Sequence, residues 1–271
     1  MLLPDEIMAY YRRGGEHTRL ASGAGRLEFL RTWDVLVRTL PPAPATVLDV
    51  GGAMGVYAGP LAGAGYRVHV VDPVPEHVDA AAQLPGVTAA LGDARALAEA
   101  DASVDAVLLL GPLYHLIDRA DRVRAWQEAG RVVRSGGPVV AAAISRFASL
   151  LDGFARGFYD DELYQPLVEG ALAEGRHHHV PDRNYFTTAY FHHPDEIAGE
   201  VADGGLELQR IAGVESPLWM MHDRLDVILD DARRRATLLD MLRTIESDAN
   251  LLGASSHLLA IARRLSPDPP R

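Results

Sequence analysis

Between Ala45 and Ile144, short apolar runs alternate with amphipathic segments, and this alternation constrains the fold more than any other feature. Strands that alternate with helical segments at this spacing form βαβ units, and these build a parallel sheet with helices on both faces. The predicted strands are Ala45–Val50, Arg67–Asp72, Val87–Leu91, Val104–Gly111 and Pro138–Ile144. The predicted helices between them are Val56–Ala64, Glu76–Gln83 and Arg119–Val133.

The flanking segments differ from this core and indicate a chain of four parts. The predicted parts are an N-terminal helical lid at 1–44, the core at 45–144, a helical and aromatic cap insertion without strands at 145–193, and the C-terminal completion of the core at 194–271. The last part has predicted strands at Leu206–Val214 and Ser256–Arg263 around a helical insert at Asp223–Ser247. We therefore expect an α/β fold with a seven-stranded, mostly parallel sheet.

Composition excludes several classes of protein. The 271 residues carry a net charge of −11, which disfavours binding to the phosphate backbone of nucleic acids. No cysteine is present, so a thiol nucleophile, a disulfide scaffold and a zinc finger are impossible. All 26 basic residues are arginine, which excludes a lysine Schiff base and a P-loop lysine. Because the sequence has neither a long apolar run nor a signal-peptide pattern, we expect a cytoplasmic protein that does not enter a membrane.

Glycine-rich or acidic segments follow three of the predicted strands. The first strand runs into Asp49–Gly55 (DVGGAMG), the second ends at Asp72, and the third leads into a turn that contains Asp93. Ligands of open α/β sheets bind at the carboxyl ends of the strands, where carboxylates can accept hydrogen bonds from ribose hydroxyls or an adenine amine. Each segment alone is also compatible with a turn or a solvated strand end. Together they predict an adenosine-binding site.

The spacing of the glycines distinguishes between two adenosine cofactors. Gly51, Gly52 and Gly55 do not match the G-x-G-x-x-G pattern of dinucleotide-binding folds. They match D-x-G-x-[GA]-x-G, and this segment resembles motif I of class I S-adenosylmethionine-dependent methyltransferases, whose fold is Rossmann-like. The run LLLGPLYHL at 108–116 and the pattern E-x-x-R-V-V-R-S-G-G at 128–137 extend the resemblance, with Ser135 in place of the usual proline. The segments GRLEFLRT, ISRFASLLDG and YFTTAYFHHPDE resemble an actinobacterial subgroup that acts on small molecules.

The resemblance implies S-adenosyl-L-methionine as cofactor, S-adenosyl-L-homocysteine as product, and a role for each motif residue. The glycine-rich loop would cradle the methionine part, Asp72 the ribose, Asp93 with Ala94 the adenine, and the backbone at Leu110 and Gly111 would face the cofactor's amino group. The full set of implied cofactor-binding residues is Asp49, Gly51, Gly52, Ala53, Gly55, Asp72, Pro73, Asp93, Ala94, Leu110 and Gly111.

Aromatic residues are concentrated in the predicted cap. Nine of the 18 aromatic residues lie between Phe147 and Phe191, which is typical of a pocket for a flat apolar ligand or of a small core within the cap. Arg146, just before this stretch, is interpreted as a carboxylate ligand or as one half of an ion pair. The candidate residues for the acceptor pocket are Tyr10, Tyr11, Tyr114, Arg146, Tyr185, Phe186, Tyr190, Phe191 and Trp219.

Histidines are considered as a general base and as metal ligands. His115 follows the fourth predicted strand beside the expected position of the methyl group, so it is the predicted base, with a structural hydrogen bond as the alternative role. The triplet at 177–179 cannot offer three ligands to one ion, because consecutive side chains point in different directions. We interpret it as an exposed loop and predict no metal.

These observations predict a cytoplasmic methyltransferase that acts on a small aromatic or heterocyclic metabolite. Members resembling the subgroup methylate the indole ring of tryptophan-containing cyclic dipeptides, and indole C-methylation is the more specific hypothesis. The alternatives are a non-catalytic cofactor-binding protein with the same fold and a nicotinamide-dependent oxidoreductase, which the glycine spacing disfavours. The predicted partner is a small-molecule substrate, with no nucleic acid or membrane, and the predicted state is a monomer or a homodimer.

Overall fold

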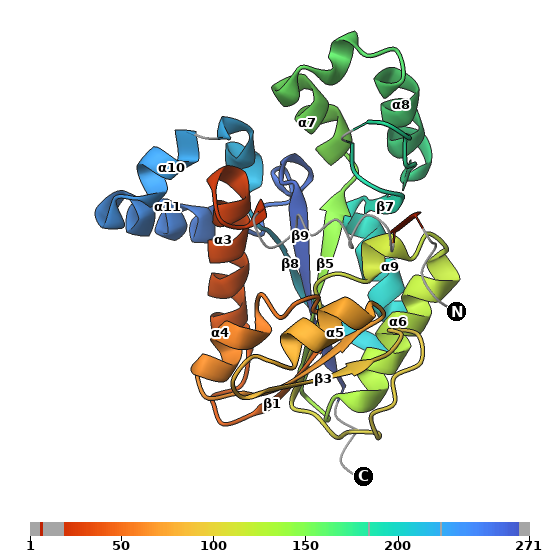
Figure 1. Ribbon diagram of the computed structural model, residues 1–271, viewed down its shortest axis with the longest axis vertical. Coiled ribbons are helices and arrows are strands. Elements are labelled where there is room, and N and C mark those ends of the chain that lie inside the picture. The colour runs from red at the N-terminus through yellow and green to blue at the C-terminus, as the bar shows by residue number, and fades with distance from the viewer. Residues whose placement is uncertain (1–5, 8–18, 184, 223, 266–271) are drawn as a thin grey trace.

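The computed structural model describes residues 6–7, 19–183, 185–222 and 224–265, and its centre is a twisted sheet (Figure 1). Its seven core strands have the order β3-β2-β1-β4-β5-β9-β8. They are β1 (Thr46–Val50), β2 (Arg67–Asp72), β3 (Val87–Leu91), β4 (Ala106–Leu109), β5 (Pro138–Ser145), β8 (Leu206–Gly213) and β9 (His257–Arg264). Neighbours from β3 to β5 are parallel, whereas β9 is antiparallel to both β5 and β8.

Helices cover both faces of this sheet, because side chains of a strand point alternately to its two sides. Helices α3 (Gly23–Thr39), α4 (Ala58–Gly63) and α5 (Pro75–Ala81) pack with Val47, Leu108 and Leu259 on one face. Helices α6 (Arg119–Val132) and α9 (Pro194–Asp203) pack with Leu48, Leu109 and Leu258 on the other. The predicted fold class is therefore confirmed. Among the described helices, none has the length and apolarity that crossing a membrane requires.

The prediction that 145–193 lacks strands is wrong. This segment rises above the carboxyl end of β5 and contains α7 (Ala148–Arg156), the short helix η2 (Phe158–Asp160) and α8 (Tyr164–Glu174), followed by strands β6 (Arg176–His177) and β7 (Ala189–His192) (Figure 1). Strand β7 pairs with Ile144 and Ser145, which lie beyond the end of β4, so the described sheet has nine strands. These two strands are too short for sequence alternation to reveal them.

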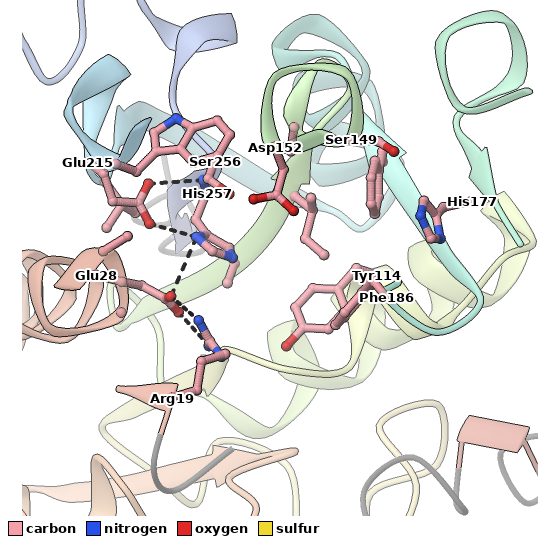
Figure 2. Close-up of a pocket in the computed structure, with 18 of the residues that line it drawn as sticks. Arg19, Glu28, Tyr114, Ser149, Asp152, His177, Phe186, Glu215, Ser256 and His257 are labelled. Carbon is pink, nitrogen blue, oxygen red and sulfur yellow. Dashed lines mark hydrogen bonds and ion pairs between the residues drawn. The ribbon is translucent and has the colours of Figure 1, made fainter. Parts of the chain in front are cut away.

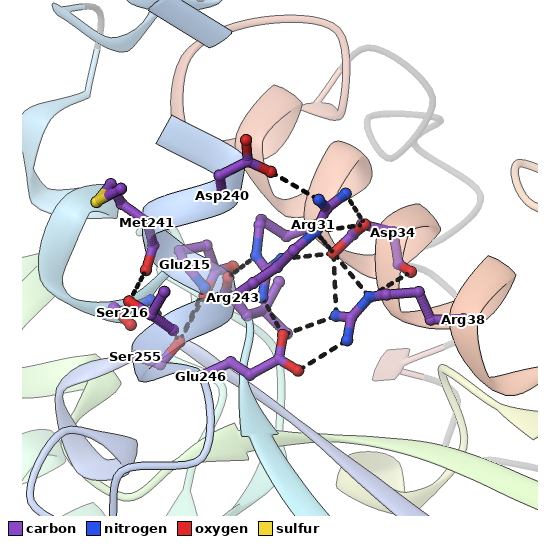
Figure 3. Close-up of polar contacts among 12 residues, drawn as sticks. Arg31, Asp34, Arg38, Glu215, Ser216, Asp240, Met241, Arg243, Glu246 and Ser255 are labelled. Atoms are coloured by element: carbon purple, nitrogen blue, oxygen red, sulfur yellow. Dashed lines mark hydrogen bonds and ion pairs between the residues drawn. The ribbon is translucent and has the colours of Figure 1, made fainter. Parts of the chain in front are cut away.

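The C-terminal insert contains several helices. It consists of the short helix η3 (Ser216–Met221), α10 (Arg224–Leu229), α11 (Ala232–Ile245) and the short helix η4 (Leu252–Ala254). Six charged residues, which we call the α3–α11 ion cluster, connect this insert with α3 and β8 (Figure 3). They are Arg31, Asp34, Arg38, Arg210, Arg243 and Glu246.

Candidate active site

The glycine-rich loop after β1 lies against the loop after β4, where the strand order of the sheet reverses. A Cβ atom on Gly51 would lie 2.8 Å from Cδ of Pro112, and one on Gly111 would lie 2.8 Å from the Gly51 carbonyl oxygen. Gly51 also has a φ of +71°, a conformation that favours glycine. The two loops therefore approach each other more closely than side chains would allow.

A cavity of about 570 Å³ opens beside these loops. It is lined by every predicted cofactor-binding residue except one: Asp49, Gly51, Gly52, Ala53, Asp72, Pro73, Asp93, Ala94, Leu110 and Gly111. The exception is Gly55, where an added Cβ would lie 2.5 Å from a Leu84 side-chain carbon. Gly55 therefore lets the loop pack on the segment after α5 and does not face the cavity.

The two acids at the ends of β2 and β3 are held by protein donors. Asp72 accepts hydrogen bonds from the amides of Ala53 and Val74, both at 2.9 Å, so it ties the loop after β1 to the loop after β2. Asp93 forms an ion pair with Arg95 at 2.6 Å. Burial raises the pKa of Asp93, but hydrogen bonds from Arg95 outweigh it, and the net pKa is lowered. Both acids are thus fixed and line the cavity.

Asp49 has a different environment. Its side chain is buried, and among the described residues neither carboxylate oxygen has a hydrogen-bond partner. Burial, reinforced by the negative charge of Asp72, raises the pKa of Asp49 to about 7. Buried carboxylates normally have partners, so a cationic hydrogen-bond donor in the cavity would satisfy this one. The amino group of S-adenosylmethionine has that chemistry, and these residues fit the cofactor.

A second cavity, of about 430 Å³, adjoins the first beneath the cap. Five residues line both cavities: Arg19, Glu28, Tyr57, Leu110 and Tyr114. Of the candidate acceptor-pocket residues, the second cavity is lined by Tyr114, Tyr185, Phe186, Phe191 and Trp219. Figure 2 shows Tyr114 and Phe186 across this cavity from Glu28 and His257.

Two candidate residues, Arg146 and Tyr190, do not line this second cavity. Arg146 is buried, pairs with Glu196 at 2.8 Å and donates to the Phe191 carbonyl at 2.7 Å, so it is a structural residue that holds β7. The Tyr190 ring lies 3.6 Å below the guanidinium carbon of Arg122 and lines neither cavity. Tyr10 and Tyr11 lie outside the described residues.

The predicted base lies in the first cavity. His115 is buried in the short helix η1 (Leu113–His115), its ring is 6.1 Å from that of Phe186, and burial lowers its pKa to about 4. The prediction of an exposed loop at 177–179 is wrong for His177, which is buried on β6 with its ring stacked 5.0 Å from that of Phe191. Successive residues of a strand face opposite sides, so Arg176 on β6 is exposed while His177 points inward.

Sequence reasoning missed several ionisable residues that line the second cavity, among them Glu28, Glu215 and His257. Nδ1 of His257 lies 2.6 Å from Oε1 of Glu215 and 3.7 Å from Oε2 of Glu28. Their ligand atoms lie within 4.8 Å of one another, as a metal site also requires. His257 begins β9, and because β9 is antiparallel to β5, its first residue lies beside the end of β5. A topology with an antiparallel last strand is the signal that would have placed His257 there.

Comparisons with known proteins support this interpretation. Residues 47–137 match the family described as "Methyltransferase domain". An uncharacterized methyltransferase of Mycobacterium tuberculosis is 42% identical over 99 residues, which cover 36% of this chain and 39% of that protein. A ubiquinone biosynthesis O-methyltransferase of Methylobacterium is 32% identical over 182 residues, covering 64% of each chain. The chain thus spans about two fifths of the length of the mycobacterial relative.

Solved structures share the fold at low sequence identity. A methyltransferase from Methanosarcina mazei superposes with a TM-score of 0.58 at 18% identity, covering 86% of this chain and 98% of that one. A geranyl diphosphate C-methyltransferase from Streptomyces coelicolor, solved with S-adenosyl-L-homocysteine, gives 0.52 at 13% identity, covering 86% and 75%. Residues 47–137 therefore match a methyltransferase domain, and the chain shares the fold of these solved S-adenosylmethionine-dependent methyltransferases.

Proposed function

We propose that this chain is an enzyme that transfers the methyl group of S-adenosylmethionine to a small aromatic or heterocyclic acceptor. The observation that carries the proposal is the pair of adjoining cavities, one lined by the cofactor motifs and one by aromatic side chains, with five residues shared between them. A cofactor in the first cavity and an acceptor in the second would meet at this shared rim. Such an arrangement turns a reaction between two molecules into one within a single complex.

The residues of the first cavity would hold the cofactor by complementary chemistry. Asp49 would bind the amino group, Asp72 the ribose, and Asp93 with Ala94 the adenine. The cofactor supplies a methyl group on a positively charged sulfur, which is reactive toward nucleophiles without help from the protein. The protein must therefore position the acceptor, exclude water and handle a proton where the acceptor carries one.

The acceptor side of the proposal rests on the aromatic walls. Tyr114, Phe186 and Phe191 offer ring faces and edges to a flat ligand, as an indole ring of a tryptophan-containing cyclic dipeptide would require. The ubiquinone-pathway relatives are O-methyltransferases by name, so hydroxyl acceptors belong to the same proposal. Membership of the actinobacterial small-molecule subgroup is likewise proposed, with the mycobacterial relatives as support. His115 remains a proposed base, but its lowered pKa makes it a weak one.

We also propose a cellular location and an oligomeric state for the protein. We infer a cytoplasmic protein, monomeric or homodimeric, whose partner is a small molecule and not a nucleic acid or a membrane. The net charge of −11 supports the exclusion of nucleic acids, because an acidic surface repels phosphate groups.

Calorimetric titration with S-adenosylmethionine and S-adenosylhomocysteine tests the function. We expect micromolar binding to the wild type and at least about tenfold weaker binding to Asp49→Asn, which removes one charge. Asp72→Ala should weaken binding as well, and His178→Gln, an exposed substitution, serves as the matched control. Binding of NAD in place of S-adenosylmethionine would support an oxidoreductase. Cofactor binding without turnover of any phenol, indole or cyclic tryptophan dipeptide would favour a non-catalytic protein.

A further inference from the structure

Four charged residues form a continuous chain along the second cavity, and we call them the acceptor-cavity ion chain (Figure 2). They are Arg19, Glu28, His257 and Glu215. Arg19 pairs with Glu28, Glu28 faces the His257 ring at 3.7 Å, and the ring contacts Glu215 at 2.6 Å. Glu28 also lines the cofactor cavity. The acceptor-cavity ion chain therefore runs from the residues shared by the two cavities into the wall of the second cavity, which we call the acceptor cavity.

Glu215 fixes the orientation of the His257 ring. The Glu215 side chain is buried, and its Oε2 accepts hydrogen bonds from the Ser255 hydroxyl at 2.9 Å and the His257 amide at 3.1 Å. The Ser255 oxygen in turn accepts from the amides of Glu215 and Ser216. Ser216 has a φ of +49°, a strained conformation for a residue other than glycine. The strained backbone of Ser216 thus places an amide that binds the Ser255 oxygen, and Ser255 in turn donates to the Glu215 carboxylate.

This geometry determines which ring nitrogen is available to a ligand. An ionised carboxylate only accepts hydrogen bonds, so Nδ1 of His257 carries a hydrogen toward Glu215. Within the described part of the chain, no hydrogen bond occupies Nε2, and His257 lines the acceptor cavity. A hydrogen bond from one ring nitrogen to a carboxylate makes the other nitrogen more basic.

The charges around His257 increase its affinity for a proton. Burial lowers the pKa of this imidazole, but Glu28 and Glu215 outweigh burial and raise it to about 9. Arg19 acts in the opposite direction. The other ionisable side chains that line the same cavity are Tyr57, Tyr114, Asp152, Arg156, Tyr164, His177, Tyr185 and His222. Burial and the Glu28 charge raise the pKa of Tyr57, so this phenol stays neutral and does not compete for the proton.

We propose that Nε2 of His257 is the hydrogen-bond partner of a weakly acidic ring O–H or N–H group of the acceptor, and that it holds this group in its deprotonated form. The inference rests on the proposed function and names its acceptor class. The acceptor's proton resides on Nε2. Electrons of the deprotonated ring form the bond to the methyl carbon, while the bond from that carbon to sulfur breaks and its electron pair stays on sulfur. At a pH near 9 or above, the proton on Nε2 then passes to water and the neutral imidazole is restored; at lower pH it stays, and the next acceptor loses its own proton to water as its anion binds.

The contacts within the acceptor-cavity ion chain favour a site for a proton over a site for a metal ion. The Glu28 carboxylate is engaged by the Arg19 guanidinium through both oxygens, and a cation would have to displace it. The 2.6 Å separation of Nδ1 and Glu215 is that of a charge-assisted hydrogen bond, which needs no ion between the atoms. His257 is therefore better placed to share a proton than to bind a metal.

The probe for the test is 4-nitrophenol, because its anion is yellow and its neutral form is not. The full chain, saturated with S-adenosylhomocysteine, is titrated with the dye at a pH below the pKa of the free dye. We expect binding to raise the anion absorbance, as its acid dissociation increases about tenfold or more beside a cation. In His257→Gln the bound dye should stay neutral, and Glu215→Gln should give a smaller increase than the wild type. His178→Gln is the matched control and should behave as the wild type.

Each other result overturns a stated part of the proposal. Dye that binds without ionising, or that ionises equally in His257→Gln, contradicts the role of Nε2. Binding of 4-nitroanisole as tight as that of the phenol, or no dye binding at all, contradicts the acceptor class. Calorimetric binding of Mn²⁺ that is lost in His257→Gln would assign the residues to a metal site. If S-adenosylhomocysteine itself does not bind, the proposed function fails, and that outcome is separate from the dye result.

Discussion

Two ionic groups contact the same helix, α3, yet they differ in how completely their members are paired. In the α3–α11 ion cluster, Asp34 contacts three arginines and Glu246 contacts three, at distances between 2.5 and 3.0 Å (Figure 3). In the acceptor-cavity ion chain, Glu28 and Glu215 share one imidazole, whose second nitrogen faces a cavity (Figure 2). Composition alone does not separate the two groups, since both combine carboxylates with basic side chains.

The difference in pairing distinguishes a structural role from a chemical one. Arg31 is fully buried, and it contacts Asp34, Glu246 and the Val214 carbonyl oxygen, so its three nitrogens are all engaged. A saturated group of this kind holds elements together and has no capacity left for a ligand. Among the described residues, Nε2 of His257 has no hydrogen-bond partner, and this ring lines the second cavity, where we propose that a substrate binds. Substitutions in the two groups should therefore affect different measurements.

The largest effect on stability is expected from Arg31→Met. Removing a buried arginine leaves Asp34 and Glu246 with less compensation for their burial, which typically costs about 3–5 kcal/mol. Urea denaturation measures this loss. The protein that remains folded should bind S-adenosylhomocysteine as the wild type does, because Arg31 lines neither cavity. An unchanged unfolding free energy would show that the cluster does not hold α3 to the insert.

His257→Gln should mainly slow methyl transfer, whereas Arg31→Met should mainly lower stability. Loss of a group that handles a proton slows the chemical step by about 100-fold or more, equivalent to about 2.7 kcal/mol in the barrier. With a neutral phenol as acceptor, wild-type kcat/KM should rise with pH toward about 9, where His257 of the enzyme without acceptor loses its proton. The variant should lack this rise of kcat/KM with pH. A variant with the wild-type rate and pH profile would remove His257 from the reaction.

The sequence predicted the lining of the first cavity better than that of the second, for a physical reason. The residues predicted to hold the cofactor lie within contiguous loops that line the first cavity, such as Asp49–Ala53, so local spacing reveals them. The acceptor cavity combines Glu28, Glu215 and His257, which are far apart in the sequence and meet only through the antiparallel pairing of β9 with β5. No local sequence pattern predicts the pairing of β9 with β5. Of the two roles predicted for Arg146, its contacts support the ion pair, whereas the position of Tyr190 near the cap did not reveal its ring contact with Arg122.

The stability of the wild type should depend on pH through His257. Its pKa is about 9 in the folded chain, against an ordinary value of about 6.5, so its contribution is complete below pH 6.5 and is lost as pH rises through 9. We expect the unfolding free energy of the wild type to fall by about 3 kcal/mol more than that of His257→Gln between these limits. Urea denaturation of both proteins at pH 6 and pH 9.5 measures the difference. Parallel changes would mean that the carboxylates do not raise this pKa.

The smallest expected effect comes from Arg243→Gln, at the edge of the α3–α11 ion cluster. Its side chain is 43% exposed, and Asp34 keeps Arg31 and Arg38 when it is removed. Solvent screens such a contact, so the unfolding free energy should fall by less than about 1 kcal/mol. Urea denaturation beside Arg31→Met gives the comparison, because both substitutions remove a partner of the same carboxylate. Equal losses would show that the number of partners, and not their burial, determines how strongly this cluster stabilises the fold.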